Sequence, residues 1–264
     1  MALKVPSLDY SKVEEAIKSF IRSKVEEAGV KGVVVGLSGG VDSSVTASLC
    51  VRALGSDRVK GLIMPDSAVT PSEDVEDALK IAEHLGIECK SIDINPLVQT
   101  IVRSHPFYDP SKVVAEGNVR ARLRMILLYY VANTLKLLVA GTGDRSEIMI
   151  GYFTKYGDGG VDILPIGGLY KTQVRELGRY LNLPSRVVEK PSSPRLWSGQ
   201  TAEGELGLSY DVIDPVLYGL YDLGLPPRRV AEEVGVPLEV VERVKGMVEA
   251  TQHKRSMPPV APIT

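Results

Sequence analysis

The residues most able to do chemistry lie between positions 33 and 44, which read Val-Val-Val-Gly-Leu-Ser-Gly-Gly-Val-Asp-Ser-Ser. An apolar β-branched run ends in glycines and then continues into an acid and two serines. This is the pattern of a strand, a tight loop and the first turn of a helix. Such a loop directs backbone N–H groups and the positive end of a helix dipole to one point, where a phosphate fits. The segment therefore predicts nucleotide binding.

Two common phosphate-binding loops do not match this segment. A P-loop needs a lysine, and none lies between Gly39 and Ser44, while residues 37–42 do not supply the Gly-x-Gly-x-x-Gly fingerprint. The pattern Ser-Gly-Gly-x-Asp-Ser at 38–43 resembles the PP-loop of the ATP pyrophosphatases, which cleave ATP between its α and β phosphates. Asp42 favours this interpretation over a plain glycine turn, because a carboxylate beside phosphates is repulsive unless Mg²⁺ lies between them.

A second candidate site is Gly-Thr-Gly-Asp-Arg-Ser-Glu at 141–147, directly after a short apolar run. It offers the hydroxyl of Thr142 and the carboxylate of Glu147. Alone, Glu147 would be interpreted as a solvated surface acid. If both loops open into one crevice, however, Asp42 and Glu147 form a natural pair of Mg²⁺ ligands for a triphosphate.

Further charged residues follow in and after a glycine-rich stretch at 151–160, which shows no regular period. Loops of this length are more often functional than idle, and this one places Lys155, Asp158 and Asp162 together. Lys171 stands at the start of a predicted helix, where a cation is poorly placed for the helix dipole. A bound phosphate would explain it, and plain solvent exposure is the alternative.

Strand and helix patterns alternate along the first two thirds of the chain, which predicts an α/β fold with a Rossmann-like parallel sheet and helices on both faces. Ligands of such folds bind beyond the carboxyl ends of the strands, so the loops at 38–44 and 141–147 should face the same crevice. After residue 211 we expect a small C-terminal helical segment. The expected helices cover residues 11–27, 42–54, 71–84, 119–134 and 170–181, and the expected strands cover 32–37, 59–64, 89–94 and 137–140.

Size and composition limit the function classes. The chain has 264 residues, 44% hydrophobic and 24% charged, with a net charge of −2, so no overall field draws it to nucleic acid or to a membrane. The N-terminal pattern lacks the apolar core of a signal peptide, and the apolar run at 125–139 is too short and too polar to span a bilayer. Two distant cysteines form no metal-binding pair and fit a reducing cytoplasm.

The predicted helix at 119–134 carries two further signals. Arg120 and Arg124 share one face, and Arg122 points nearly opposite. Beyond them, residues 125–132 are apolar on every side, which indicates burial all round. One side can pack on the sheet, and a second copy of the chain is the simplest cover for the other, although the C-terminal segment of the same chain could also reach it.

Taken together, these motifs resemble those of the ammonia-dependent NAD synthetases over nearly the full chain. The matching blocks are residues 38–44, 117–125, 141–147, 151–162, 165–174, 190–197, 199–201 and 253–255. The block Gly-Tyr-Phe-Thr-Lys-Tyr-Gly-Asp-Gly-Gly-Val-Asp at 151–162 is the most specific, because other PP-loop enzymes lack it. The resemblance implies an adenine nucleotide alpha hydrolase-like fold and a single domain over residues 1–264, with no glutaminase domain. It also implies a cytoplasmic homodimer that uses small-molecule substrates.

The resemblance also implies a role for each matching residue. Mg²⁺ would be held by Asp42 and Glu147, and the expected catalytic residues are Asp42, Lys171 and Asp162. ATP would be bound by Gly36, Leu37, Ser38, Gly39, Gly40, Val41, Asp42, Ser43, Thr142, Lys171 and Ser193. Deamido-NAD would be bound by Arg122, Lys155, Asp162, His253 and Lys254. Thr154, Asp158 and Asp162 are the candidates for guiding ammonia.

The implied activity is that of a ligase that forms a C–N bond. The nicotinate carboxylate of deamido-NAD attacks the α phosphate of ATP, pyrophosphate leaves, and ammonia converts the acyl-adenylate into NAD and AMP. The sequence departs from the family pattern in two places. Asp144-Arg145 replaces the usual Asn-Lys pair, and Ala202 stands where an Asp commonly follows Gly-Gln-Thr. Other PP-loop enzymes that amidate or thiolate a nucleotide or tRNA, and an ATP-binding module without chemistry, are the alternatives.

Overall fold

The computed structural model describes residues 3–263 and is built on a parallel sheet with the strand order β3-β2-β1-β4. The strands are β1 (Gly32–Gly36), β2 (Val59–Ile63), β3 (Glu88–Ser91) and β4 (Leu137–Ala140). On β1, Val33 pairs with Val59 on one side and with Leu138 on the other. The chain turns from β1 toward β2 and β3 on one side and toward β4 on the other. The switch point, where ligands of such sheets bind, therefore lies between β1 and β4.

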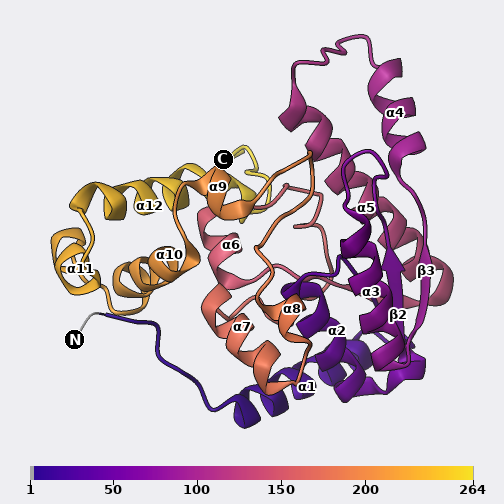
Figure 1. Ribbon diagram of the computed structural model, residues 1–264, viewed down its shortest axis with the longest axis horizontal. Coiled ribbons are helices and arrows are strands. Elements are labelled where there is room, and N and C mark those ends of the chain that lie inside the picture. Colours follow the sequence, from indigo (N-terminus) through magenta and orange to yellow (C-terminus); the bar gives the residue numbers. More distant parts are fainter. Residues whose placement is uncertain (1–2, 264) are drawn as a thin grey trace.

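Helices cover both faces of the sheet, as the alternation predicts (Figure 1). The valines of β1 are fully buried, because side chains on both faces of this strand meet a helix layer. One layer consists of α1 (Tyr10–Glu27), α2 (Val41–Leu54), α3 (Ser72–Leu85), α7 (Lys171–Tyr180) and α8 (Ser185–Val188), which share the main core. The other layer is formed by α4 (Asn95–Ser104) and α5 (Val113–Leu135), which pack on β1, β2 and β4.

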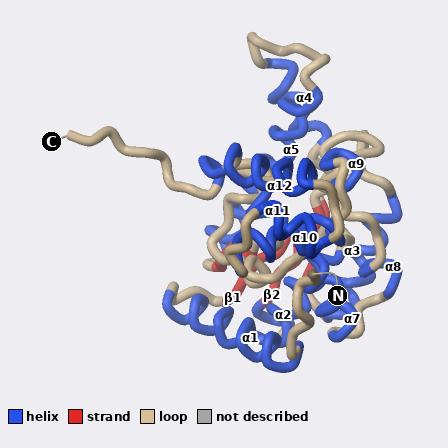
Figure 2. The backbone as a smooth tube through the Cα atoms, turned by 90° about the vertical axis from the view of Figure 1, so that its left-hand side faces the viewer, coloured by secondary structure: helices blue, strands red, loops and turns tan. Residues whose placement is uncertain are grey.

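A separate apolar cluster holds the C-terminal part of the chain. It joins α6 (Arg145–Ile150) to α9 (Ala202–Leu206), α10 (Tyr210–Leu217), α11 (Pro227–Val234) and α12 (Leu238–Ala250). The N-terminal arm before α1 is held along this lobe and along α7. The Leu3 N–H donates to the Glu233 carbonyl on α11, and the Gln173 side chain on α7 donates to the Pro6 carbonyl. After the turn at Gln252–Lys254, the chain extends away from the body (Figure 2).

The main differences from the sequence-based expectation are four helices that were not expected, α4, α6, α8 and α9, and the limits of β3 and α5. The helix α4 was not expected, although Leu97, Val98, Ile101 and Val102 recur at helical spacing; of its residues only Val98 is buried. The strand β3 ends at Ser91 and not at Ile94, because the Asp93 carboxylate accepts from the Asn95 N–H and turns the chain into α4. The helix α5 begins at Val113, six residues before the start that was expected after Gly117-Asn118. In the described part of the chain, every helix is too short or too polar to cross a membrane.

Candidate active site

The loop between β1 and α2 has the backbone geometry of an anion site. Gly39 takes a positive φ of 76°, and α2 begins at Val41 with Gly40 as an N-cap that has no side-chain cap hydrogen bond. The loop is held from within, since the Ser43 and Ser44 hydroxyls both donate to the Gly40 carbonyl. The side chains that could cap the helix are therefore turned to the loop carbonyl. Its first N–H groups remain available to an anion.

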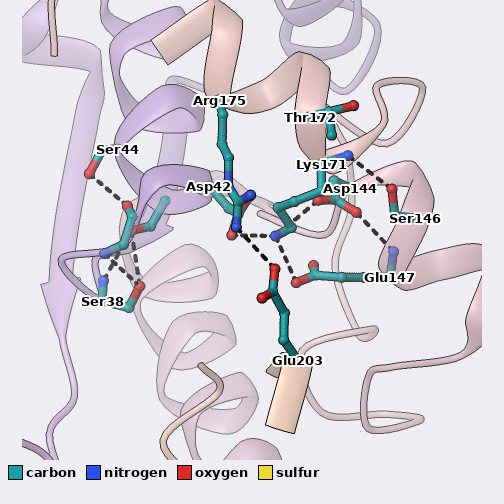
Figure 3. A network of polar contacts seen from close by, with 12 residues as sticks. Ser38, Asp42, Ser44, Asp144, Ser146, Glu147, Lys171, Thr172, Arg175 and Glu203 are labelled. Atoms are coloured by element: carbon teal, nitrogen blue, oxygen red, sulfur yellow. Dashed lines mark hydrogen bonds and ion pairs between the residues drawn. The ribbon is translucent and has the colours of Figure 1, made fainter. Parts of the chain in front are cut away.

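Four charged side chains meet beside this loop (Figure 3). The Lys171 Nζ lies 2.7 Å from the Asp42 Oδ2, 2.8 Å from the Glu147 Oε1 and 2.9 Å from the Asp144 Oδ2. The side chains of Lys171 and Asp144 are fully enclosed, whereas Asp42 and Glu147 keep 21% and 19% of their side-chain surface exposed. The crevice therefore has a buried cation in its floor and two carboxylates at its surface.

Local structure explains how these four residues come together. Asp144 caps α6, because its Oδ1 accepts from the Glu147 N–H at 2.8 Å, and this fixes the first turn that carries Glu147. Lys171 is the first residue of α7, and its N–H donates to the Ser146 hydroxyl. The same hydroxyl donates to the buried Asp214 at 2.6 Å. The two helix starts are thereby tied together opposite the start of α2, which carries Asp42.

Electrostatics of the cluster are dominated by burial. Burial raises the pKa of Asp144 to about 7 and the pKa of Glu147 well above its usual range, although attraction to Lys171 opposes both shifts. Burial would lower the pKa of Lys171, but attraction to Asp144, Asp42 and Glu147 outweighs it and holds the pKa well above the ordinary value. One cation thus faces three carboxyl groups, an excess of acidic groups that a further cation would hold in their ionised forms.

This excess fits a divalent cation. The Asp42 Oδ1 is buried without a hydrogen-bond partner, and an oxygen of this kind is what Mg²⁺ takes as a ligand. Among the described residues, no set of three or more carboxylate, histidine or cysteine side chains is arranged to hold a metal by itself. Mg²⁺ in nucleotide sites is ordinarily held by one or two carboxylates together with phosphate oxygens and water. Asp42 and Glu147 therefore fit the ion if a nucleotide completes its shell.

A cavity of about 360 Å³ opens over this cluster. It is bounded by the ends of β1 and β2, the start of α6, the loop at 151–158 and the segment at 192–200. The predicted residues that line it are Gly36, Leu37, Ser38, Asp42, Ser43, Thr142, Glu147, Ser193 and Lys254. Gly40 and Val41 line a smaller cavity next to it. Residues distant in sequence, predicted for ATP except for the Mg²⁺ ligand Glu147 and for Lys254, thus surround one space of nucleotide size.

The residues predicted for deamido-NAD form a second, connected group. The Arg122 guanidinium donates to the Lys155 carbonyl at 3.3 Å, and the Lys155 Nζ donates to the His253 carbonyl at 2.6 Å. The Lys254 Nζ donates to the carbonyls of Gly151 and Phe153 at 2.7 and 2.8 Å. The glycine-rich loop therefore packs between α5 and the C-terminal turn, and only Lys254 of this group reaches the cavity wall.

Asp162 lies apart from the lysine cluster. Its carboxylate accepts from the Val139 N–H at 2.7 Å and from the Tyr129 hydroxyl at 3.0 Å, so it fastens the chain after β4. It does not line the cavity, whereas Asp158 and Thr154 do. The structure therefore brings Asp42 and Lys171 together but not Asp162, and its geometry gives no support to the expected catalytic role of Asp162. Binding of deamido-NAD by Asp162 stays a prediction.

Sequence reasoning missed several residues of the site. It noted Asp144 only as a departure from a family pattern, although its position between Thr142 and Glu147 is a signal. Arg124 also lines the cavity and donates to the Met64 and Pro194 carbonyls. Lys190 could not be assigned, because its partners are more than a hundred residues away in the sequence.

Comparisons with known proteins give one consistent family. Residues 13–258 match the model of the NAD synthase family. The NH(3)-dependent NAD(+) synthetase of Hyperthermus butylicus is 57% identical over 252 residues, which cover 96% of this chain and 91% of that protein.

Two solved structures share the fold closely. The NMN synthetase from Francisella tularensis has a TM-score of 0.86 and 34% identity, covering 97% of this chain and 100% of the other. The NH3-dependent NAD synthetase from Campylobacter jejuni, in complex with the nitrate ion, has a TM-score of 0.82 and 32% identity with the same coverage. The α/β fold expected from the sequence is thereby confirmed.

Proposed function

The chain belongs to the NAD synthase family, and on this premise we propose that it is a ligase that amidates deamido-NAD with ammonia at the expense of ATP. The products are NAD, AMP and pyrophosphate. The observation that carries the proposal is the PP-loop beside Asp42 and Glu147, which line one cavity and both contact the buried Lys171 ammonium. The names of relatives up to 57% identical support the substrate assignment over other PP-loop amidations.

The first step is the formation of an acyl-adenylate. A carboxylate oxygen of the nicotinate ring attacks the α phosphorus of ATP, and the bond from that phosphorus to the bridging oxygen breaks. The PP-loop N–H groups and Lys171 receive the negative charge of the leaving pyrophosphate. To do so, the Lys171 Nζ turns from its carboxylate partners to a phosphate oxygen. Asp42 and Glu147 would hold Mg²⁺, which supplies neutralisation of charge on the phosphates.

The second step is the attack of ammonia on the acyl carbon, with AMP as the leaving group. Of the three candidates for guiding ammonia, Asp158 and Thr154 line the cavity and Asp162 does not. The Asp158 Oδ1 accepts from the Thr154 N–H at 2.8 Å, so both belong to one loop conformation. We assign ammonia positioning to this pair, since a carboxylate there can also take the proton that the attacking nitrogen must lose.

A homodimer is the second part of the proposal. On α5, Ile126 and Tyr130 are 54% and 71% exposed, and Leu128 on the opposite side packs against the sheet. An apolar helix face of this kind is typical of a subunit interface. The exposed side lies on the same helix as Arg122, which would place bound deamido-NAD close to the partner. A cytoplasmic location stays a prediction from the low cysteine content.

Product analysis tests the proposal. The purified protein is incubated with ATP, Mg²⁺ and ammonium, and with deamido-NAD, nicotinate mononucleotide or xanthosine monophosphate in separate reactions. We expect NAD, AMP and pyrophosphate in equal amounts from deamido-NAD, by mass spectrometry. If only nicotinate mononucleotide were amidated, the substrate assignment would change from deamido-NAD to the mononucleotide. Release of pyrophosphate without any amide product would contradict the proposed ligase activity. Glutamine in place of ammonium should give little product.

A further inference from the structure

A small cavity lies between the PP-loop and the segment from Lys190 to Arg195. One wall is formed by Ser38, Gly40 and Val41, and the other by Lys190, Ser192 and Arg195. It joins the nucleotide cavity, because Ser38, Asp42 and Ser193 line both spaces. The start of α2, to which we assign phosphate binding, thus faces two cationic side chains that the mechanism above does not use.

These two cations pair with acids on α3, and one of these acids, Asp74, itself lines both cavities. The Asp74 Oδ1 lies 2.9 Å from the Lys190 Nζ, and the Asp74 Oδ2 lies 2.7 Å from the Arg195 Nε. Lys190 also lies 2.5 Å from the Asp77 Oδ2, and Arg186 pairs with the other oxygen of Asp77. The two cations at the cavity, Lys190 and Arg195, are therefore balanced by two carboxylates, and the third cation, Arg186, is half-exposed and lies outside the cavity.

The same acids are fixed in position relative to the PP-loop. A Cβ atom added to Gly39 would lie only 2.2 Å from the carbonyl oxygen of Asp74, so the loop backbone is in direct contact with the first turn of α3. Side-chain exposure of Asp74 and Asp77 is only 7% and 4%. Buried carboxylates of this kind hold long cationic side chains in one geometry. The side chains then lose less conformational entropy when they bind an anion.

A third observation concerns the hydroxyl of Ser192. Its Oγ is buried and has no hydrogen-bond partner, although it lines both cavities. An unpaired buried hydroxyl costs free energy in the empty protein. It would gain a partner from an acceptor in the cavity, such as a phosphate oxygen.

We propose that Lys190, Ser192 and Arg195 form the second wall of the pyrophosphate site and bind the β and γ phosphates across from the PP-loop. This inference rests on the proposed function and adds residues that were not predicted from the sequence. The PP-loop contributes N–H groups on one side, and the segment at 190–195 contributes two charges and a hydroxyl on the other. Pyrophosphate carries more charge than the loop and Lys171 together neutralise, so additional cations favour its departure from the α phosphate.

Measurements of pyrophosphate binding distinguish a direct role of these residues in phosphate binding from a purely structural role. Titration calorimetry is carried out in the presence of Mg²⁺ with pyrophosphate and, as the matched ligand, with AMP, which lacks the β and γ phosphates. We expect Lys190→Met and Arg195→Gln each to raise the Kd of pyrophosphate about tenfold, the loss of one charge-assisted hydrogen bond. The Kd of AMP should change less than about twofold. Lys190→Arg should restore most of the affinity, because it keeps the charge.

Two further variants protect the test against misfolding. Ser192→Ala leaves every ion pair intact and removes an unpaired hydroxyl, so it should fold at least as stably and still bind pyrophosphate several-fold more weakly. Arg186→Gln is the matched control, since Arg186 shares Asp77 with Lys190 but is 52% exposed and lines neither cavity. We expect its affinity for pyrophosphate to stay unchanged.

The outcomes are distinct from those of the product analysis. Unchanged pyrophosphate affinity in Ser192→Ala and in both charge variants would overturn the proposal, even if the protein forms NAD. Equal losses for pyrophosphate and AMP would also overturn it, because the segment would then support the cavity as a whole. Failure to form NAD from deamido-NAD would instead refute the proposed function.

Discussion

Replacing Lys171 by methionine tests the central cluster most directly. The substitution keeps the length of the side chain and removes its only charge. In the folded protein, Asp144 is fully enclosed and Asp42 and Glu147 are largely so, and each lies within 2.9 Å of the Lys171 Nζ. Without the cation, three carboxyl groups face one another in a space with little water.

The magnitude follows from this burial. Removing one partner of a buried ion pair costs about 3–5 kcal/mol of unfolding free energy. For a domain of this size, such a loss lowers the Tm by roughly 6–20 °C. Turnover should fall about 10²- to 10³-fold, the effect of losing one electrostatic contact to a leaving group.

A double variant distinguishes this reasoning from simple loss of packing. Asn can replace Asp144 without losing the cap of α6, because its side-chain oxygen also accepts from the Glu147 N–H. Lys171→Met/Asp144→Asn should therefore recover part of the lost stability and none of the activity. Thermal unfolding and steady-state pyrophosphate release measure the two effects. A single variant with near-normal turnover, or a double variant no more stable than the single one, would refute the interpretation.

Three further predictions concern other parts of the site. Asp144→Asn alone should change the pH dependence of stability: with a pKa raised from 3.8 to about 7, the folded carboxyl binds a proton that the unfolded one releases. The free energy of unfolding therefore falls in the native protein as the pH rises from about 4 to about 7. The fall should be smaller in the variant, as urea titrations over this range would show; an identical slope would contradict the assignment. Gly39→Ala should weaken ATP binding more than about tenfold, because Gly39 has a φ of 76° and touches the Asp74 carbonyl. Gly246→Ala on α12, whose added Cβ would meet nothing within 4 Å, is the control for calorimetry. Arg120→Met should cost about 3–5 kcal/mol, since it leaves the fully buried Asp66 without the guanidinium 2.6 Å away; chemical denaturation would measure it, and a loss below about 1 kcal/mol would show that the pair is not needed.

Local sequence patterns were sufficient for the sheet and for most helices. The β-branched run before Gly36 predicts β1, and the following glycines and serines predict the turn into α2. The helix α4 was missed even though Leu97, Ile101 and Val102 lie at helical spacing, and its single buried valine shows that it packs on the body only lightly. The opposite orientation of Arg120 and Arg122 was predicted from helix geometry and is confirmed, because Arg120 pairs with Asp66 and Arg122 faces the Lys155 carbonyl.

In the candidate site too, some features were predicted from the sequence and others were found only in the structure. Asp42 and Glu147 were predicted to share a crevice because both follow the carboxyl ends of neighbouring parallel strands. Lys171 was expected to need a reason for its place at a helix start. The structure supplies one that the sequence did not indicate, namely three carboxylates around a fully buried ammonium group. Asp162 was grouped with the catalytic residues, but its two hydrogen bonds direct it to β4 and α5 instead.

The sequence by itself determined the chemistry available to this protein: a phosphate loop, two acids at strand ends and a family pattern that spans the chain. These features depend on backbone conformation over a few residues, which side-chain types and spacing control. Tertiary structure alone decided which charges neutralise one another. Asp144, Lys190 and Arg195 acquire their partners across 27 to 121 residues of chain, and the strength of those contacts depends on burial that only the packed fold creates.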